Sequence, residues 1–344
     1  MNILVITQKV DQDDTVLGFF HGWLNALGEK FDHVSVICLE KGSTDLPQDM
    51  PVYSLGKESG FSRIRYVWNL FFYLGKLHHR YDCVLVHMNY EYVLLAGWWW
   101  RLFGRKIGFW YNHTYGNIFS RIAFMIAHRV FHTSPFAFSA GRSNSVSMPA
   151  GIDTKLFSTT QNQVPNTILF VGRIAPVKGL ITLIKAVQLL VQRGVSVSLN
   201  IYGEALSRDR KYQERVHVEA QNLVTRGIVK FHNGVAYDQV PQLFASHEFF
   251  VNLTPKGNFD KTVLEAMASG AIPVVSSTAF SDLLPPPTFF KEHDADDLAR
   301  QLEYLMKLSF EEKSKIRGLL RKRVEKKHDL HVLVSRLAEE FDTL

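Results

Sequence analysis

The sequence predicts an α/β protein of two domains, each built on a doubly wound parallel sheet. Short apolar runs typical of buried strands alternate with longer helical patterns along both halves of the chain, and such alternation predicts parallel strands. The length of 344 residues is long for one domain and sufficient for two separate cores. A hydrophobic content of 46% and a charged content of 21% are typical of a soluble globular protein.

The first half of the chain is expected to form the first domain, residues 1–158. It opens with a strand at residues 3–7, followed by a polar loop and a helix that begins near Gly18. Further strands are expected at residues 33–39, 52–54, 83–87 and 107–111, and further helices at residues 64–77 and 92–103. The stretch from Gly141 to Val164 is expected to be a linker, because it contains turn residues and ends in a polar run.

The second domain, residues 159–326, is expected to repeat this alternation. Strands are expected at residues 168–171, 196–202, 229–232, 249–253 and 272–275, with helices after Gly179, within 208–225 and around Glu265. The last helical stretch runs from residue 310 to residue 342 and is strongly basic over residues 313–327. Its end, residues 327–344, is expected to be a terminal helix.

The loop after the strand at residues 168–171 carries two cations. Gly172 lets the backbone turn where the strand ends, Arg173 and Lys178 follow in the loop, and a helix begins after Gly179. Ligands of open α/β sheets bind at the carboxyl ends of the strands, and helix N-termini favour anions. Arginine offers a planar fork for phosphate oxygens, and lysine offers a mobile charge. The stretch therefore suits a phosphate group, although two solvated loop cations would give the same pattern.

A second stretch, residues 256–276, holds an acidic residue inside a short helix. Glu265 lies in this helix, which ends at Gly270 before the strand at residues 272–275. A carboxylate there can accept hydrogen bonds from both hydroxyls of a ribose, whereas an isolated glutamate on a helix is usually solvated. The helix start at residues 261–263 can turn backbone N–H groups toward a diphosphate. The two stretches together favour a nucleotide site.

Two motifs, preceded by Gly-Ile-Asp at residues 151–153, resemble those of the retaining family-4 glycosyltransferases. The first is Gly-Arg-Ile-Ala-Pro-Val-Lys-Gly at residues 172–179, and the second is Leu-Glu-Ala-Met-Ala-Ser-Gly-Ala-Ile-Pro-Val-Val at residues 264–275. The resemblance covers essentially the whole chain and implies the GT-B fold, in which two Rossmann-like domains face each other across a donor cleft. It also implies that the first domain binds the acceptor and that the terminal helix returns to it.

The resemblance further implies roles for single residues. Arg173 and Lys178 would hold the diphosphate of a nucleotide-sugar donor, and Glu265 would hold its ribose. His113, which follows the strand at residues 107–111, would reach the donor sugar or the reaction centre; the alternative for one of 14 histidines is a structural role. His113, Arg173 and Lys178 are therefore the expected catalytic residues. The other residues expected to bind the substrates are Gly18, Gly172, Gly203, Gly234, Asp260, Lys261, Thr262 and Val263.

One position departs from the family pattern. The family often has a glutamate eight residues before the ribose-binding one, in a Glu-x-Phe-Gly sequence, and this glutamate usually touches the donor sugar. Here Gly257 stands at that position, and Asn258 or Asp260 would take over part of the contact. The departure keeps open a catalytically weak or silent protein that binds nucleotide sugars. A nucleotide-sugar epimerase of the same fold is a further alternative.

The resemblance implies a retaining glycosyltransferase that moves a sugar from a UDP- or GDP-linked donor to an acceptor hydroxyl. The family's usual account is attack on the same face of the sugar, assisted by the leaving phosphate. No metal or other cofactor is expected, because Arg173, Lys178 and a helix N-terminus can stabilise the leaving diphosphate. The acceptor is expected to be a glycan or a lipid-linked molecule, in the assembly of a cell-surface glycan or glycolipid.

The segment from residue 60 to residue 142 is strongly basic and rich in aromatic residues. It holds ten Lys and Arg against two Asp and Glu, and it includes the run Trp98-Trp99-Trp100. Cations beside interfacial aromatic residues suit an anionic membrane surface, although several of these aromatics must also fill the core. Nucleic acid is not an expected partner, because no binding motif accompanies the charge.

The start of the chain and its cysteines predict a cytoplasmic protein. The first residues have no basic region and too short an apolar run for a signal peptide. No run approaches the roughly 18 apolar residues of a membrane span. Cys38 and Cys83 lie in apolar strand-like runs, as buried free thiols do in a reducing compartment. The basic segment adds the expectation of peripheral contact with the inner face of a membrane.

Overall fold

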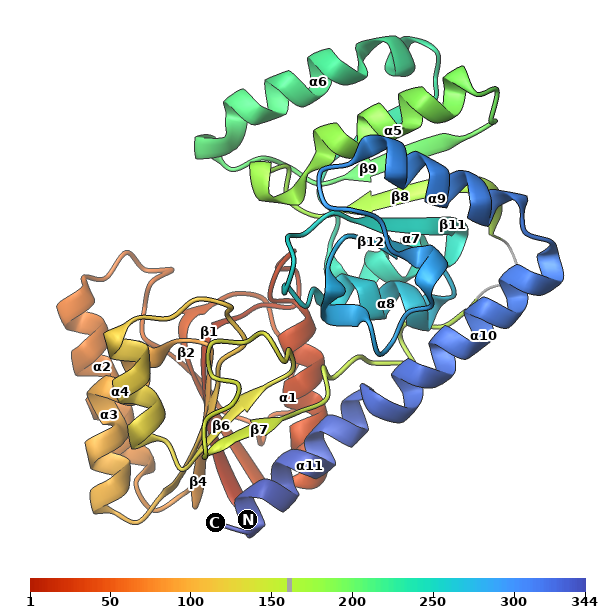
Figure 1. The fold of residues 1–344 in the computed structure, drawn as a ribbon. Coiled ribbons are helices and arrows are strands. Elements are labelled where there is room, and N and C mark those ends of the chain that lie inside the picture. The colour runs from red at the N-terminus through yellow and green to blue at the C-terminus, as the bar shows by residue number, and fades with distance from the viewer. Residues whose placement is uncertain (160–162) are drawn as a thin grey trace. The chain divides into compact units, whose positions relative to one another are not determined.

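The computed structural model describes residues 1–159 and 163–344, which form two compact units. The first unit comprises Met1–Gly151 with Leu330–Leu344, and the second comprises Ile152–Asp329; the sequence placed the corresponding boundaries at residues 158 and 326. Each unit is built on one parallel sheet with helices on both faces (Figure 1). The predicted fold class, two doubly wound α/β domains, is confirmed.

The first unit is organised around a seven-stranded sheet in which every neighbouring pair of strands is parallel. The spatial order is β3 (Val52–Ser54), β2 (His33–Lys41), β1 (Asn2–Val10), β4 (Cys83–His87), β5 (Lys106–Trp110), β6 (Arg129–His132) and β7 (Ser145–Ser147). One face is covered by α1 (Phe19–Lys30) and α11 (Leu330–Asp342), and the other by α2 (Arg63–Leu77), α3 (Tyr90–Leu102) and α4 (Ile118–Ile126) (Figure 1).

The residues of β1 show why helices cover both faces of this sheet. Ile3 and Val5 are buried in the core shared with α1 and α11, whereas Leu4 and Ile6 are buried in the core shared with α2–α4. Successive side chains of a strand point to opposite faces of the sheet. A continuous apolar run therefore requires an apolar layer on each side, which is the usual environment of parallel strands.

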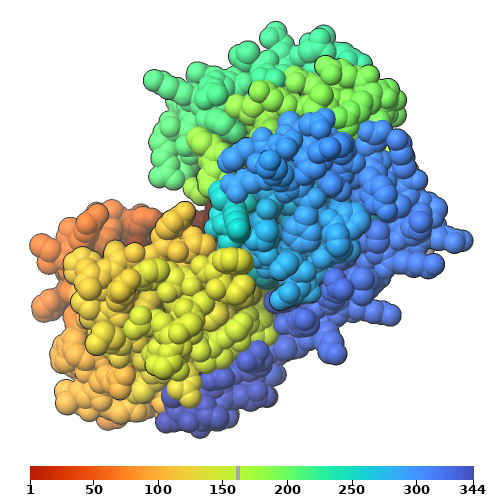
Figure 2. Space-filling model, viewed as in Figure 1, coloured from red at the N-terminus to blue at the C-terminus, as the bar shows by residue number. Residues whose placement is uncertain are grey.

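The second unit is organised around a five-stranded parallel sheet. Its spatial order is β10 (Val229–His232), β9 (Ser198–Tyr202), β8 (Val164–Val171), β11 (His247–Asn252) and β12 (Ile272–Val275). Helices α5 (Leu180–Gln192), α6 (Arg210–Thr225) and α9 (Ala295–Lys307) share one core with the sheet. Helices α7 (Val240–Ser246), α8 (Lys261–Ser269) and α10 (Phe310–Lys327) lie on the other face (Figure 1). Figure 2 shows the same molecule as a space-filling view.

Several elements have no counterpart in the sequence prediction, namely α4, β6, β7, α7 and α9. Strand β7 lies inside the expected linker at residues 141–164, so that expectation is wrong for the first part of the linker. Residues 160–162 of the expected linker lie outside the described residues. Strands β6 and β7 have only 4 and 3 residues and contain Arg, His and Ser, so neither gives an unbroken apolar run.

The helical stretch expected at residues 310–342 consists of two helices, α10 and α11, separated by His328 and Asp329. The expected terminal helix, residues 327–344, corresponds to α11. Contacts with residues far away in the sequence fix this break. The Ile152 N–H donates to the carbonyl of His328 at 2.8 Å, and the Thr154 hydroxyl donates to the Asp329 carboxylate at 2.6 Å. The first bond satisfies a carbonyl that the helix end leaves open, and no local sequence pattern predicts either bond.

Candidate functional site

The loops at the carboxyl ends of the second sheet bring together most of the residues predicted as a site. Gly172 follows β8, Gly203 follows β9 and Gly234 follows β10. The loop after β11 leads to Asp260 and helix α8. Because the strands are parallel, their carboxyl ends meet at one edge of the sheet, and ligands of open α/β sheets bind at this edge.

The backbone conformation at Gly172 and Gly203 requires glycine. Gly172 and Gly203 have φ values of 147° and 145°, which side-chain-bearing residues rarely adopt. A Cβ atom at Gly203 would lie 2.0 Å from the carbonyl oxygen of Gly172. The turns after β8 and β9 therefore touch through their main chains, which leaves backbone rather than side chains at this part of the edge.

Lys178 and Asp260 form an ion pair at the same edge. Lys178 ends the 3-10 turn Pro176–Lys178, and its Nζ is 2.6 Å from Oδ2 of Asp260. The amide of Asn252, the last residue of β11, also donates to this oxygen at 3.2 Å. Asp260 in addition caps α8, because the N–H and the hydroxyl of Thr262 donate to its Oδ1 at 3.3 and 2.9 Å. The carboxylate is thus held by a cation, an amide and a helix N-terminus, which are groups that also bind phosphate.

These donors determine the protonation state of Asp260. Burial alone would raise the pKa of its carboxyl, but the charge of Lys178 and the hydrogen bonds from Lys178, Thr262 and Asn252 outweigh burial and lower the pKa to about 2. The side chain keeps an exposed fraction of 18%. Asp260 is therefore an anion at physiological pH, and its charge stands at the N-terminus of α8.

The backbone N–H groups predicted to face a diphosphate are partly engaged already. The Thr262 N–H donates to the Asp260 carboxylate, and the Val263 N–H donates to the Asp260 carbonyl at 3.2 Å. An anion bound at the start of α8 would compete with Asp260 for the first of these groups. The helix N-terminus is therefore occupied by a carboxylate from its own chain.

Glu265 lies on the same helix and is buried, with an exposed fraction of 4%. The hydroxyl of Tyr237 donates to its Oε1 at 3.1 Å. Burial raises the pKa of Glu265, while the charge of Lys261 and the bond from Tyr237 act in the opposite direction. Burial likewise lowers the pKa of Lys261, four residues earlier. A buried acid and a half-buried base on one helix, each with a shifted pKa, are typical of functional sites.

Arg173 differs from Lys178 in that its side chain is exposed. It lies in the chain between Gly172 and the turn that carries Lys178, and its side chain meets solvent. Gly179, which follows this turn, has a φ of 61° and starts α5. A Cβ atom there would lie 3.1 Å from the Cβ of Leu253, so the turn is packed against the residue that follows β11.

Gly18 and His113 belong to the first unit, at the carboxyl edge of its sheet. Gly18 precedes α1 with φ −55° and ψ −32°, a conformation that any residue adopts, so the backbone does not require glycine there. His113 is exposed in the loop after β5, and its ring centroid is 5.2 Å from that of Tyr111. Asn112 fixes this loop by accepting hydrogen bonds from two backbone N–H groups after β6, at 2.9 and 3.0 Å.

Two polar residues of the second unit were missed by the sequence analysis. Tyr237, the partner of Glu265, starts a 3-10 turn after Gly234, in a stretch where no periodic pattern marks it. Asn252, which donates to Asp260, ends the apolar strand β11. A polar residue at the carboxyl end of a buried strand is a usable signal, because that is where ligands bind. Nothing comparable distinguishes Tyr237.

Gly257 stands where the family often has a glutamate. Its φ is 88°, in the left-handed region that favours glycine. A glutamate with this backbone would be strained, so the loop between β11 and Asp260 has a conformation suited to glycine. The hydroxyl of Ser277 also holds this loop, because it donates a hydrogen bond to the carbonyl of Asn258 at 2.8 Å.

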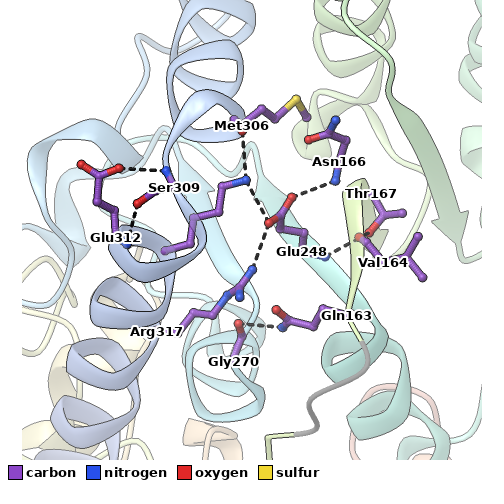
Figure 3. Close-up of polar contacts among 11 residues, drawn as sticks. Gln163, Val164, Asn166, Thr167, Glu248, Gly270, Met306, Ser309, Glu312 and Arg317 are labelled. Atoms are coloured by element: carbon purple, nitrogen blue, oxygen red, sulfur yellow. Dashed lines mark hydrogen bonds and ion pairs between the residues drawn. The ribbon is translucent and has the colours of Figure 1, made fainter.

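A second buried charge cluster lies at the amino edge of the same sheet (Figure 3). Glu248, near the start of β11, has an exposed fraction of 5%. Its Oε1 lies 3.1 Å from Lys313 Nζ and 3.1 Å from Arg317 Nη2, both on α10. Its Oε2 accepts from the Asn166 N–H at 2.8 Å. This cluster ties α10 to the sheet and was not predicted from the sequence.

As a whole, the carboxyl edge of the second sheet offers cations and hydrogen-bond donors suited to an anion. Lys178, Arg173 and the start of α8 can stabilise negative charge, and Glu265 can accept hydrogen bonds from hydroxyl groups. Within residues 1–159 and 163–344, no three His, Cys, Asp or Glu side chains are grouped as metal ligands.

The second unit also identifies the family of the protein. The family model described as "Glycosyl transferases group 1" matches residues 152–323, which is half of the chain. The chain therefore belongs to the glycosyl transferases group 1 and is a glycosyltransferase. No curated protein matches its sequence.

Solved structures of the same fold cover both units. HepE from Anabaena, in complex with UDP and glucose, is 17% identical, with 100% of both chains covered and a TM-score of 0.80. A glycosyltransferase from Rickettsia africae is 15% identical, with 100% of this chain and 99% of that chain covered and a TM-score of 0.76. Sucrose-phosphate synthase from Thermosynechococcus elongatus is 15% identical, with 100% and 98% covered and a TM-score of 0.74. At these identities the likeness defines the fold, which is GT-B.

Proposed function

We propose that this glycosyltransferase is a retaining enzyme of family 4 that moves a sugar from a nucleotide diphosphate sugar to an acceptor hydroxyl. The observation that carries the proposal is the position of Lys178, 2.6 Å from Asp260 at the N-terminus of α8. A diphosphate at this edge would meet Lys178, Arg173 and a helix N-terminus, the groups that best stabilise its charge. Glu265, on the same helix, would accept hydrogen bonds from the ribose.

In the proposed reaction, the bond between the anomeric carbon and the diphosphate breaks, and its electron pair leaves with the diphosphate. The acceptor oxygen forms the new bond on the same face of the sugar, so the anomeric configuration is retained. The acceptor proton passes to the leaving phosphate. Arg173 and Lys178 would stabilise the charge that develops on the diphosphate without a metal ion, and His113 would contact the donor sugar.

Asp260 would give this site a feature of its own. Its carboxylate holds both Lys178 and the Thr262 N–H, and a bound diphosphate would compete for both. We propose that Lys178 turns from Asp260 to the diphosphate when the donor binds. The released carboxylate would then accept a hydrogen bond from a hydroxyl of the donor sugar. This bond would replace the sugar contact of the family's usual glutamate, whose position is held here by Gly257.

The proposed donor is a UDP-sugar, with a GDP-sugar as the alternative. HepE, which shares the fold, was solved with UDP and with UDP-glucose. The backbone at Gly203 and Gly234 would border the nucleotide, and Gly18 would border the donor phosphate or the acceptor. The proposed acceptor is a glycan or a lipid-linked molecule in the assembly of a cell-surface glycan. The proposed location is the cytoplasm, at the inner face of a membrane.

Calorimetry combined with a product assay tests this function. UDP- and GDP-sugars would be titrated into the protein, and bound donors would then be incubated with candidate acceptors. The expected result is release of nucleoside diphosphate and a product whose anomeric configuration, read by NMR, equals that of the donor. Donor binding without any release would support the silent protein, and conversion of the donor sugar to its epimer would support the epimerase. Failure of every nucleotide sugar to bind would contradict the proposal.

A further inference from the structure

The outer surface of α2, α3 and α4 in the first unit is unusually apolar. Nine large apolar side chains of these helices have exposed fractions between 41% and 83%: Ile64, Trp68, Phe72, Trp98, Leu102, Ile118, Phe119, Ile122 and Met125. We call this set the apolar surface. Exposed apolar residues scattered singly need no explanation, whereas a contiguous group marks an interaction site.

The apolar surface is not required to cover the sheet. On α2, the buried residues that face the core are Leu70, Leu74 and Leu77, whereas Ile64, Trp68 and Phe72 form a separate stripe at four-residue spacing. Each of these helices is thus apolar on two sides. A helix of an isolated globular protein needs only one apolar side, against the core.

The opposite face of the same sheet provides an internal comparison. Of the residues that the structure describes, α1 and α11 contribute no large exposed apolar side chain. Their apolar residues, such as Trp23 and Leu333, are buried in the core. Both layers cover one sheet, so the difference between them is not a property of the fold. It reflects what the outer side of α2–α4 contacts.

The three helices lie together on their side of the sheet (Figure 1), and residues of this orange to yellow part of the chain are on the visible surface in Figure 2. The contact between α3 and α4 is close, because a Cβ atom at Gly97 would lie 2.4 Å from a methyl carbon of Ile126. The rings of Phe71 on α2 and Trp98 on α3 are 6.1 Å apart. The helices that carry the apolar surface are therefore in contact with one another, α2 with α3 and α3 with α4.

Cations accompany the apolar side chains on these helices. Arg63, Arg65, Arg101 and Arg121 are exposed, and residues 60–142 hold ten Lys and Arg against two Asp and Glu. A partner that matches both properties has an apolar interior and an anionic surface. A second copy of this chain would bring the same excess of positive charge, so charge repulsion opposes self-association through this face.

We propose that the apolar surface docks onto an anionic lipid bilayer. The aromatic and aliphatic side chains enter the boundary between headgroups and acyl chains, and the surrounding arginines contact lipid phosphates. No helix of residues 1–159 and 163–344 is long and apolar enough to cross a membrane. The mode of contact we propose is therefore peripheral, and it does not depend on which sugar the protein transfers.

Vesicle co-sedimentation with purified full-length protein tests the proposal. Vesicles of phosphatidylcholine with and without phosphatidylglycerol would be compared, and the expected result is binding to the anionic vesicles alone at about 0.1 M salt. Binding should weaken at about 1 M salt, where the Debye length falls from about 10 Å to about 3 Å. The exposed Trp68 and Trp98 should shift their fluorescence to the blue on binding, because they leave water.

Two variants separate the two parts of the surface. Ile64→Ser/Trp68→Ser/Phe72→Ser should lower the vesicle partition coefficient at least about tenfold, since three apolar side chains lose their burial in lipid. Arg63→Glu/Arg65→Glu/Arg121→Glu should lower it at least about a hundredfold, because each cation near an acidic surface contributes to binding. Nucleotide binding, measured in parallel, should be unchanged and reports that the protein is folded.

Matched variants of the second unit serve as controls. Lys315→Glu/Lys322→Glu/Lys326→Glu reverses three exposed cations of α10, and Val218→Ser/Val224→Ser/Tyr304→Ser removes three exposed apolar side chains. Both should bind vesicles as the wild type does. Equal loss in the α10 variant would mean general charge attraction and would overturn the assignment of this face. Two further results would overturn the proposal. One is wild-type protein that stays in the supernatant with anionic vesicles at low salt. The other is a wild-type dimer, seen by analytical ultracentrifugation, that is lost in the Ile64→Ser/Trp68→Ser/Phe72→Ser variant.

Discussion

Strand β11 has a carboxylate paired with a lysine near each of its ends. At the amino end, Glu248 contacts Lys313 at 3.1 Å, and beyond the carboxyl end Asp260 contacts Lys178 at 2.6 Å. The amino-end pair lies between a strand and α10 and is almost completely buried. The pair at the carboxyl end joins two loops, its side chains are about one-fifth exposed (21% and 18%), and the loop that carries Lys178 also holds the exposed Arg173.

The difference teaches that an ion pair alone does not identify a site. The Glu248 cluster is closed, since both of its carboxylate oxygens accept from groups of the same unit: two side chains of α10 and the Asn166 N–H. The Asp260 cluster is formed by donors that a phosphate could take over, at the end of the sheet where ligands bind. We therefore expect substitutions at the first cluster to change stability and substitutions at the second to change donor affinity.

The largest effect is expected at the closed cluster. Glu248→Gln leaves a buried lysine and a partly buried arginine on α10 without a charge partner, and breaking a buried ion pair in this way costs about 3–5 kcal/mol. The free energy of unfolding of the second unit, from urea denaturation, should fall by about this amount. The nucleotide affinity of the protein that remains folded should equal that of the wild type.

A second variant shows whether charge or packing is responsible. Glu248→Leu/Lys313→Met/Arg317→Met removes all three charges together and should recover most of the lost stability, because replacing a complete buried charge set by apolar residues is often neutral. If Glu248→Gln weakened donor binding more than it lowered stability, the Glu248 cluster would also serve donor binding. The proposed division between a stabilising cluster and a binding cluster would then be wrong.

The next effect is expected at Lys178. Lys178→Ala removes a charge-assisted hydrogen bond to the proposed diphosphate, worth about 1.5–3 kcal/mol, so affinity for UDP should fall roughly tenfold to a hundredfold. Affinity for uridine, which has no phosphate, should stay the same. Arg173→Ala is expected to act in the same direction. Calorimetry with both ligands makes the measurement.

A double-mutant cycle with Asp260 distinguishes a ligand contact from a structural one. If Lys178 served only to neutralise Asp260, the variant Lys178→Ala/Asp260→Asn would bind UDP as the wild type does. We expect instead that the double variant keeps the loss, and that Asp260→Asn alone binds UDP at least as tightly as the wild type, because it releases Lys178. Restoration of affinity in the double variant would remove Lys178 from the donor site.

The fold class followed from the sequence because many of its strands are apolar runs that alternate with helical patterns. Residues 83–86 and 272–275, for example, are buried along their whole length and appear in the sequence as unbroken apolar runs. The elements that were missed, such as β6 and β7, owe their pairing to neighbours in the sheet rather than to a local pattern. Short strands of this kind are decided by tertiary contacts, which a single sequence does not contain.

The same limit applies to the candidate site. Gly172, Lys178 and Glu265 could be grouped from the sequence, because each follows or precedes a strand of one parallel sheet. The ion pair between Lys178 and Asp260, 82 residues apart, depends on how two loops fold back, and the contact of Tyr237 with Glu265 depends on a turn without a signature. Glu248 was missed because it precedes the apolar part of its strand, and its partners Lys313 and Arg317 lie more than 60 residues later in the chain.

A smaller effect on stability is expected from Asp260 itself, and it depends on pH. The pKa of its carboxyl is about 2 in the folded protein and returns to its ordinary value of 3.8 on unfolding. The charged form therefore contributes about 2 kcal/mol above pH 4, and this contribution is lost as the pH falls from about 4 to about 2. Asp260→Asn should lower the free energy of unfolding at pH 6, and its difference from wild type should shrink toward pH 3. A constant difference over this range would show that the charge is not what stabilises α8.

The smallest effect is expected at Glu265, where the substitution keeps the shape of the side chain. Glu265→Gln replaces charge-assisted hydrogen bonds to the ribose by neutral ones, so affinity for UDP should fall by about 1 kcal/mol, or roughly fivefold. The 2′,3′-dideoxy form of UDP has no ribose hydroxyls, and its affinity should not change.

Tyr237→Phe is the matched control, because it removes the hydrogen bond that orients Oε1 of Glu265 and leaves the charge. It should lower the affinity for UDP less than Glu265→Gln does. Equal losses for UDP and its dideoxy form in Glu265→Gln would mean that the carboxylate supports α8 and does not touch the ribose. Glu265 would then have a structural role, as Glu248 has near the amino end of β11.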